Sequence, residues 1–194
     1  LTLRPCRRRC LHTKLLCGLA DSARTKLDLT AMYVDLRGTE AREHFSAGTL
    51  QSMGIDRGTQ VLDALLAAAE RGVAMRLLLG TLNNPINGSE VRELLTYANV
   101  QARTWDPKPW YGGGIMHLKL WHADQTAAYE YRREGEPNPP VFHARSQRRA
   151  FDSLRWQLGS ANPDWKSLAQ VKELGVLLNG SAATADIGRV FDVF

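Results

Sequence analysis

Cysteine is scarce in this sequence, and long apolar runs are absent from its first part. The three cysteines, Cys6, Cys10 and Cys17, all lie near the start of the chain. An odd number of clustered cysteines is not a disulfide framework, and Cys-x3-Cys without a downstream pair is a poor zinc site. The apolar stretch at residues 15–20 is too short and too polar to span a membrane. A disulfide-stapled scaffold is therefore excluded. Because the chain begins with Leu rather than Met, a remnant of a signal or anchor stays open.

Acidic residues are few in two basic segments, and these segments carry the net charge of +5. Residues 1–26 hold seven Lys or Arg against Asp21 alone, and residues 130–157 hold six Arg against four acidic residues. The remainder of the chain is mildly acidic. Charge alone is therefore a weak indication of nucleic-acid binding. A length of 194 residues with 44% hydrophobic residues predicts one folded domain rather than two, and excludes general disorder.

The rest of the chain alternates strand and helix patterns. Period-two alternation or short buried runs predict strands, and apolar residues at helical spacing predict helices. We expect strands at residues 26–36, 73–79, 100–105, 115–123 and 173–178, and helices at residues 59–71, 89–97 and 182–194. Residues 106–114 form a loop on their Pro and Gly content. This order predicts an α/β layered domain over residues 26–194, preceded by a basic leader, residues 1–25, with no predicted element and consistent with disorder.

A histidine and a lysine, His117 and Lys119, stand one residue apart on a predicted strand. Their side chains should point to the same face, because alternate residues of a strand do so. A nucleophilic imidazole beside an ammonium that anchors an anion suits attack on a phosphodiester. Further along, Ser160 and Asn162 can add neutral donors to the same phosphate oxygens, where negative charge develops. His122 has the opposite parity from His117, so we expect it to face the other side and to be structural.

The full pattern, His117-x-Lys119 with Asp124 and then Gly159-Ser160-x-Asn162, resembles the HxKxxxxD…GSxN signature of the phospholipase D superfamily. An HxK alone carries little weight, because His12 and Lys14 form a second one without the Asp or the GSxN. The stretches MHLKLWHADQTAAY and LGSANPDWKSLAQVKELGVLL strengthen the combination. They are similar to the branch that includes the lysosomal phospholipase-D-like 5′-exonucleases of animals. The similarity extends over residues 20–194, apart from residues 130–157.

This resemblance implies an α/β lobe with a mixed β-sheet and helices on its faces. It implies phosphodiester hydrolysis through a phosphohistidine, with His117 as nucleophile or as its acid partner and no cofactor or metal. Lys119, Ser160 and Asn162 would hold the phosphate. Glu173 falls where family members place a carboxylate that hydrogen-bonds an active-site imidazole, and such a carboxylate fixes the orientation of the ring. We interpret Asp124 as structural. A lysosomal or other endomembrane lumen would follow from this branch, and the chain itself does not indicate a location.

Two departures from the family pattern affect these expectations. Residues 130–157 interrupt the interval between Asp124 and Gly159, and their removal restores the family spacing by joining Tyr129 to Leu158. They are either a loop that leaves the sheet or a stretch that the mature protein lacks. The second departure is that the sequence stops at Phe194, where relatives begin a second HxK lobe. We expect truncation, with homodimerisation as the other route to a second motif.

The substrate and the role of the loop before the motif stay open. A phosphodiester substrate would be either single-stranded nucleic acid or a phospholipid headgroup. The alternative function is a truncated or degenerate lobe that is not catalytic and binds anions or a partner. Trp110 and Tyr111, next to a glycine run, either line a substrate groove or anchor the loop.

Overall fold

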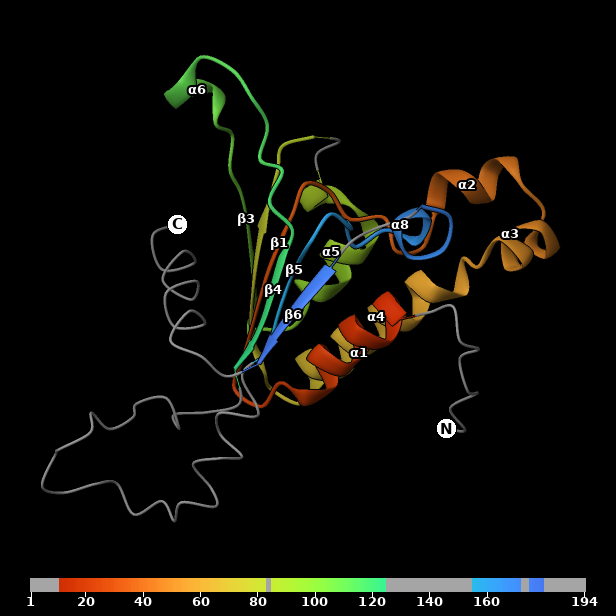
Figure 1. Ribbon diagram of the computed structural model, residues 1–194, viewed down its shortest axis with the longest axis horizontal. Helices are drawn as coiled ribbons and strands as arrows, with labels where there is room; N and C mark the ends of the chain where they lie inside the picture. Colours follow the sequence, from red (N-terminus) through yellow and green to blue (C-terminus); the bar gives the residue numbers. More distant parts are fainter. Residues whose placement is uncertain (1–10, 83–84, 125–154, 172–174, 180–194) are drawn as a thin grey trace, which may run out of the picture.

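The computed structural model describes residues 11–82, 85–124, 155–171 and 175–179, and these form a sheet with a layer of helices (Figure 1). The strands are β1 (Lys26–Ala31), β2 (Ala74–Leu79), β3 (Val100–Thr104), β4 (Leu120–Asp124), β5 (Arg155–Gly159) and β6 (Gly175–Asn179). The helices are α1 (Leu11–Ser22), α2 (Thr39–His44), α3 (Ala47–Met53), α4 (Asp56–Glu70), α5 (Ser89–Leu94), α6 (Lys108–Tyr111) and α8 (Trp165–Ala169), with a 3-10 turn η1 (Pro85–Asn87). The predicted helix at residues 182–194 lies outside the described residues.

The six strands form one mixed sheet in the order β3-β2-β1-β4-β5-β6. Strand β2 pairs parallel with both β1 and β3, whereas β4 pairs antiparallel with β1, β5 with β4, and β6 with β5. The parallel strands β1, β2 and β3 are connected through helices, as parallel strands require. The predicted α/β fold with a mixed sheet is confirmed.

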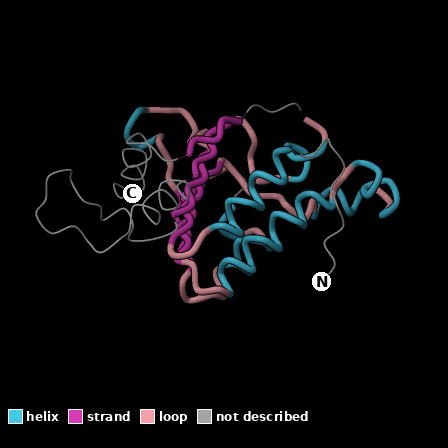
Figure 2. The backbone as a smooth tube through the Cα atoms, turned by 60° about the horizontal axis from the view of Figure 1, so that its bottom comes forward, coloured by secondary structure: helices cyan, strands magenta, loops and turns pink. Residues whose placement is uncertain are grey.

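Helices α1, α4 and α5 pack on the same face of the sheet, on one side of the strands in Figure 2. From β1, Leu27, Leu29 and Ala31 enter the core on that face, and residues in register with them on β2 and β4 do the same. Each large apolar side chain buried there contributes about 1.5–3 kcal/mol. The alternate residues of β1, Asp28 and Thr30, are polar and buried, and they belong to the opposite face.

Glycine is required where α4 passes the chain that leaves β1. A Cβ built on Gly58 would lie 2.0 Å from the carbonyl oxygen of Leu36, so any side chain there would clash with backbone. Helix α4 begins at Asp56, earlier than the predicted start at residue 59, and Gly58 lies in its first turn. The contact fixes the segment after β1, which forms part of the site described below.

Helix α1 corrects the expectation for the leader. Part of the predicted leader folds as Leu11–Ser22, and Leu16, Leu19, Ala20 and Ala23 are buried in the main core. These positions have helical spacing, which the basic and cysteine-containing composition of the segment obscured. The second HxK, formed by His12 and Lys14, therefore lies on a helix rather than on a strand. Residues 1–10 lie outside the described part of the chain.

Strand β5 corrects the predicted end of the insertion. Residues 155–157, assigned to the insertion, pair with β4 and β6, with Arg155 opposite Ala123 and Gln157 opposite Trp121. Strand β5 is therefore continuous through Leu158 and is hydrogen-bonded on both sides. The sequence pattern missed this start because Arg155 and Gln157 interrupt the apolar pattern by which strands are recognised. Residues 125–154 lie outside the described residues.

The register of β5 allows two deletions of equal length to be compared. Removal of residues 130–157 would place residues 127–129 at the register positions of residues 155–157, whereas removal of residues 127–154 keeps the observed strand. We expect both variants to fold. Because β5 is already paired on both sides and loop-closure entropy grows slowly with length, the gain in unfolding free energy should be about 1 kcal/mol or less.

Thermal melts of both deletion variants and the parent check this expectation. The deletion of residues 127–154 should melt at least as high as the deletion of residues 130–157, because it retains the native strand residues. A lower melting temperature for both variants would show that the segment is an integral part of the fold. Sequencing of the transcript across the junction decides whether the segment is present in the mature protein.

Candidate phosphodiesterase site

The segment that enters β4 and the segment that leaves β5 meet at one edge of the sheet. Leu120, the first residue of β4, is in register with Leu158 on one side and with Thr30 on the other. Because β4 is antiparallel to both neighbours, the residues before Leu120 lie beside those after Leu158 and after Thr30. This topology brings His117 and Lys119 to the same edge as Ser160 and Asn162.

The strand predicted at residues 115–123 begins later than expected. Strand β4 starts at Leu120, so His117 and Lys119 precede it. The backbone N–H of Leu120 donates to Oγ1 of Thr30 at 2.8 Å, and β1 itself ends at Ala31. Because β1 ends there, the hydrogen-bond ladder between β1 and β4 does not continue past this bond to the Thr30 side chain. The argument from strand alternation therefore does not apply to His117 and Lys119.

His117 and Lys119 differ in exposure. His117 is exposed, whereas Lys119 is only 2% exposed. The Nζ of Lys119 donates to the carbonyl oxygen of His117 at 3.0 Å. A buried ammonium is stable only when it is hydrogen-bonded, and this bond fixes the backbone at the histidine. The result is an accessible imidazole whose main chain is held by a neighbouring positive charge, which suits a nucleophile that must meet an anion.

The side chain of Asn162 is oriented by the backbone after β1. The N–H of Met32 donates to Oδ1 of Asn162 at 3.2 Å, and Asn162 is 6% exposed. Oδ1 accepts from this donor, and Nδ2 is the group through which the Asn162 side chain can itself donate a hydrogen bond. An oriented amide is a fixed hydrogen-bond donor, as stabilisation of an anionic transition state requires.

Backbone bonds hold the Asn162 loop to the same segment. The N–H of Asp35 donates to the carbonyl of Pro163 at 3.1 Å, and the N–H of Trp165 donates to the carbonyl of Asp35 at 3.1 Å. Asp164 then caps α8, where its Oδ1 accepts from the N–H of Ser167 at 3.0 Å. Such N-caps contribute about 1 kcal/mol. The loop is therefore fixed at both ends, and the Asn162 amide has little freedom to rotate.

Tyr33 is a residue of this edge that the sequence did not reveal. It follows Met32, is partly buried and hydrogen-bonds the side chain of Asn162. Burial raises the pKa of the Tyr33 phenol, and the negative charge of Asp164 raises it further. The phenol therefore stays protonated at neutral pH. Its position just past the carboxyl end of β1 is the signal that could have identified it, because ligands of open α/β sheets gather at such ends.

The remaining residues of the predicted motif lie at different places relative to this edge. Ser160 is exposed and follows the end of β5 at the site edge. Glu173 lies outside the described residues, although β6 begins at Gly175, opposite Gly159 and thus at the same edge. Asp124 is in register with Lys26, at the opposite end of β4 from His117. This position agrees with the interpretation of Asp124 as structural.

His122 belongs to an ionic cluster on the sheet rather than to the site edge. Its Nδ1 lies 3.5 Å from Oδ2 of Asp28, and Arg76 donates to both oxygens of that carboxylate at 2.7 and 2.8 Å. Burial opposes ionisation of Asp28, but the hydrogen bonds from Arg76 and the close contact with His122 outweigh it and hold the pKa of Asp28 below its ordinary value. Lys26 adds an ion pair at 3.2 Å. His122 therefore stabilises the buried carboxylate.

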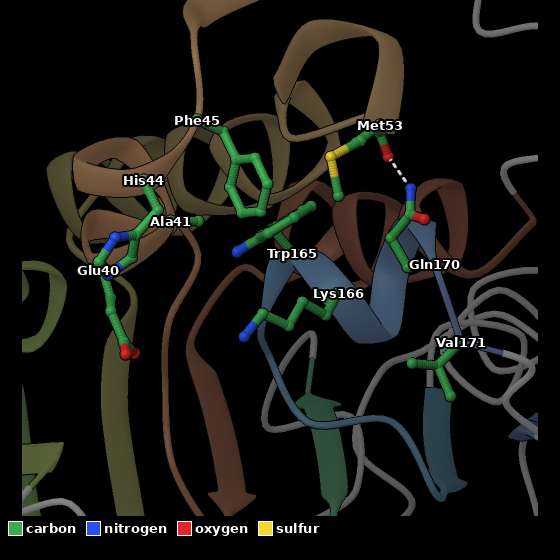
Figure 3. Close-up of a pocket in the computed structure, with 9 residues that line it drawn as sticks. All are labelled: Glu40, Ala41, His44, Phe45, Met53, Trp165, Lys166, Gln170 and Val171. Carbon is green, nitrogen blue, oxygen red and sulfur yellow. Dashed lines mark hydrogen bonds between the residues drawn. The ribbon is translucent and has the colours of Figure 1, made fainter. Parts of the chain in front are cut away.

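A cavity of about 430 Å³ lies beside α2, α3 and α8, and its walls include none of the motif residues (Figure 3). Phe45 and Trp165 lie next to each other in it, and Gln170 donates to the carbonyl of Met53 at its border. The lining residues are Glu40, Ala41, His44, Phe45, Met53, Trp165, Lys166, Gln170 and Val171. The cavity is therefore separate from the edge that carries His117.

Neither a metal-binding cluster nor a helix that could span a membrane occurs among the described residues. Over residues 11–82, 85–124, 155–171 and 175–179, no three His, Cys, Asp or Glu side chains are grouped so that they could hold a metal ion. None of the helices that the structure describes is both long and apolar enough to cross a membrane.

Comparison with known families identifies the class of the chain. A sequence model described as "Cardiolipin synthase, PLD-like domain" matches residues 16–193. With its sheet topology and its paired motifs, the chain belongs to this phospholipase-D-like family, and the predicted relationship to the phospholipase D superfamily is confirmed.

Individual relatives agree with this assignment. The 5′-3′ exonuclease PLD3 of Rattus norvegicus is 30% identical over 178 residues, which cover 91% of this chain and 28% of the relative. The virion nicking-joining enzyme of Monkeypox virus is 31% identical over 143 residues, which cover 73% of this chain and 26% of the relative. The chain thus spans less than a third of these relatives.

A solved structure shares the fold. NucT from Helicobacter pylori superposes with a TM-score of 0.54 at 16% sequence identity, covering 93% of this chain and 88% of NucT. At this identity the likeness supports the fold alone.

Proposed function

We propose that this chain supplies one of two catalytic motifs of a phosphodiesterase, in which His117 forms a phosphohistidine. The observation that carries the proposal is the meeting of two distant motifs at one sheet edge, where an exposed His117 lies by a buried Lys119 and an oriented Asn162. An exposed imidazole with fixed cationic and amide donors nearby suits in-line attack on a phosphodiester.

The reaction would proceed in two steps. An imidazole nitrogen of His117 bonds to phosphorus while the bond to the leaving oxygen breaks, and a second histidine, from another motif, gives that oxygen a proton. Water then attacks phosphorus, passes a proton to the second histidine, and releases His117. Lys119, Ser160 and Asn162 would bind the non-bridging oxygens, and Glu173 would orient an imidazole. Each fixed donor of this type is worth about 2.7–4 kcal/mol in the transition state.

Single-stranded nucleic acid is the substrate class that we favour. The two relatives carry the names exonuclease and nicking-joining enzyme, and both names denote action on nucleic acid. A phospholipid headgroup presents the same phosphodiester chemistry, so the comparison of an oligonucleotide with a phosphatidylcholine vesicle decides between them. Preferential hydrolysis of the lipid would exclude the nuclease assignment.

The intact protein should cleave a phosphodiester without added metal. In the proposed reaction His117 provides the nucleophile, and Lys119 and Asn162 provide the charge stabilisation that a metal ion gives in other phosphodiesterases. The measurement is hydrolysis of an oligonucleotide and of methyl 4-nitrophenyl phosphate in excess chelator. We expect the rate with chelator to match the rate without it. Complete loss of activity that zinc or magnesium restores would contradict the mechanism.

A further inference from the structure

The most exposed apolar side chains of the described chain belong to one short projection, the aromatic arm (residues 105–115). Tyr111 is 78% exposed, Trp110 is 74% exposed and Ile115 is 57% exposed. In Figure 1, α6 lies beyond the end of the strands and apart from the layer formed by α1, α4 and α5. Contiguous exposed apolar groups, unlike single scattered ones, are a mark of binding surfaces.

The tip of the arm is a hydrogen-bonded turn that keeps its rings in solvent. The N–H groups of Trp110 and Tyr111 both lie 3.0 Å from the carbonyl of Pro107, to which they donate. Gly112 ends α6 with φ of 70°, and its N–H donates to the carbonyl of Lys108 at 2.9 Å. Left-handed backbone there favours glycine. The rings therefore project from a defined turn, which lowers the entropy lost when a ligand binds.

The base of the arm is attached to the body of the protein beside the site. At its start, the N–H of Trp105 donates to the carbonyl of Leu79 at 2.9 Å. At its end, Met116 is only 5% exposed, and its carbonyl would lie 3.2 Å from a Cβ on Gly80. The next residue is His117. The aromatic arm thus projects from the same sheet edge that carries the nucleophile.

We propose that the aromatic arm is a stacking platform for the bases of a single-stranded nucleic acid whose phosphodiester lies at His117. This inference rests on the proposed function and adds to it the part of the chain that would bind the bases beside the scissile bond. Exposed rings stack on any base, and cations beside them attract the phosphate backbone. Lys108 supplies such a cation next to Trp110 and Tyr111.

A membrane surface is a less suitable partner for this arm. Helices that lie in a lipid interface present a wide apolar face. Helix α6 is 4 residues long, and it has Lys108 and Asp106 beside its rings. Insertion of the arm into lipid is one of the outcomes that the experiment below distinguishes.

The test is made on the intact protein with Trp110→Ala, Tyr111→Ala and the double variant. Affinity for a 5′-labelled oligothymidine is measured in a His117→Asn background, and kcat/KM is measured with oligothymidine and with methyl 4-nitrophenyl phosphate, which has no nucleobase. Trp110→Phe preserves stacking. Phe45→Ala is the matched control, because Phe45 is an aromatic residue 48% exposed on another part of the chain.

Each alanine variant should bind the oligonucleotide about tenfold more weakly, and the double variant about a hundredfold more weakly. Trp110→Phe and Phe45→Ala should bind normally, and hydrolysis of the small diester should be unchanged in all of them. Binding should also quench tryptophan emission, and comparison with Trp110→Phe, which binds normally but lacks the exposed indole, assigns the quenching to Trp110; Trp121 and Trp165, 0% and 1% exposed, cannot reach a base.

Three outcomes would overturn the inference. Unchanged oligonucleotide affinity would remove the platform, and equal losses on both substrates would assign the arm to folding or to contact with another lobe. Loss of binding to phosphatidylserine vesicles with normal oligonucleotide affinity would make the arm a membrane contact. Failure of the proposed function gives a different result from failure of this inference. If the proposed function is wrong, the unaltered protein hydrolyses neither substrate. Oligonucleotide affinity still tests the arm in that case.

Discussion

His117→Asn should lower kcat for phosphodiester hydrolysis at least about a thousandfold while the protein remains folded, as removal of a nucleophile requires. The exposed position of His117 makes this separation of activity from stability possible, because its side chain is not part of the core. Asparagine is close to histidine in size and can still form hydrogen bonds. Its amide cannot attack phosphorus to form the covalent intermediate that water cleaves in the second step. The variant should leave the melting temperature close to that of the parent.

The matched control is His122→Asn. His122 is 6% exposed and lies by the buried Asp28, so its loss should lower the melting temperature by removing a partner of that carboxylate. The rate per folded molecule should stay near the parental value. Normal turnover in His117→Asn together with a loss in His122→Asn would show that the nucleophile has been assigned to the wrong histidine.

The chain of 194 residues should be inactive as a monomer. The proposed mechanism needs a nucleophile and a separate acid on opposite sides of one phosphorus, and a single motif supplies one of these histidines. Among the residues that the structure describes, no second histidine lies at the sheet edge with the exposed His117 to protonate the leaving oxygen. Turnover by the monomer should not exceed that of its His117→Asn variant.

Analytical ultracentrifugation, combined with an activity assay on each separated species, measures which oligomeric state carries the activity. Activity should appear only in a species with two motifs, either a dimer of this chain or the chain with a second HxK lobe. For a dimer, mixing with excess His117→Asn chain should reduce activity, because mixed dimers contain a single competent histidine. An active monomer would contradict the requirement for two motifs.

Local sequence patterns were sufficient to locate most of the helices and strands and the HxK and GSxN motifs. Periodicity along the chain identified the helix that became α4 and the strands around it, because burial of one face imposes that spacing on the residues themselves. The predictions failed where contacts with distant parts of the chain, rather than the local pattern, decide the structure. The α1 segment looked like a basic leader, yet Leu16 and Leu19 are buried against the sheet. Strand β4 starts at Leu120 because β1 ends opposite it.

The sequence by itself determined the fold class and which side chains carry the proposed chemistry, because HxK and GSxN are patterns of residue types at short spacing. Only the tertiary structure decided how those side chains are held. Asn162 is oriented by the N–H of Met32, a group separated from it by most of the chain. Every residue except proline has an N–H, so no sequence pattern marks the one that turns an amide toward a site. That contact exists because β4 pairs antiparallel with β1 and β5 pairs antiparallel with β4, which brings the C-terminal ends of β1 and β5 to one edge.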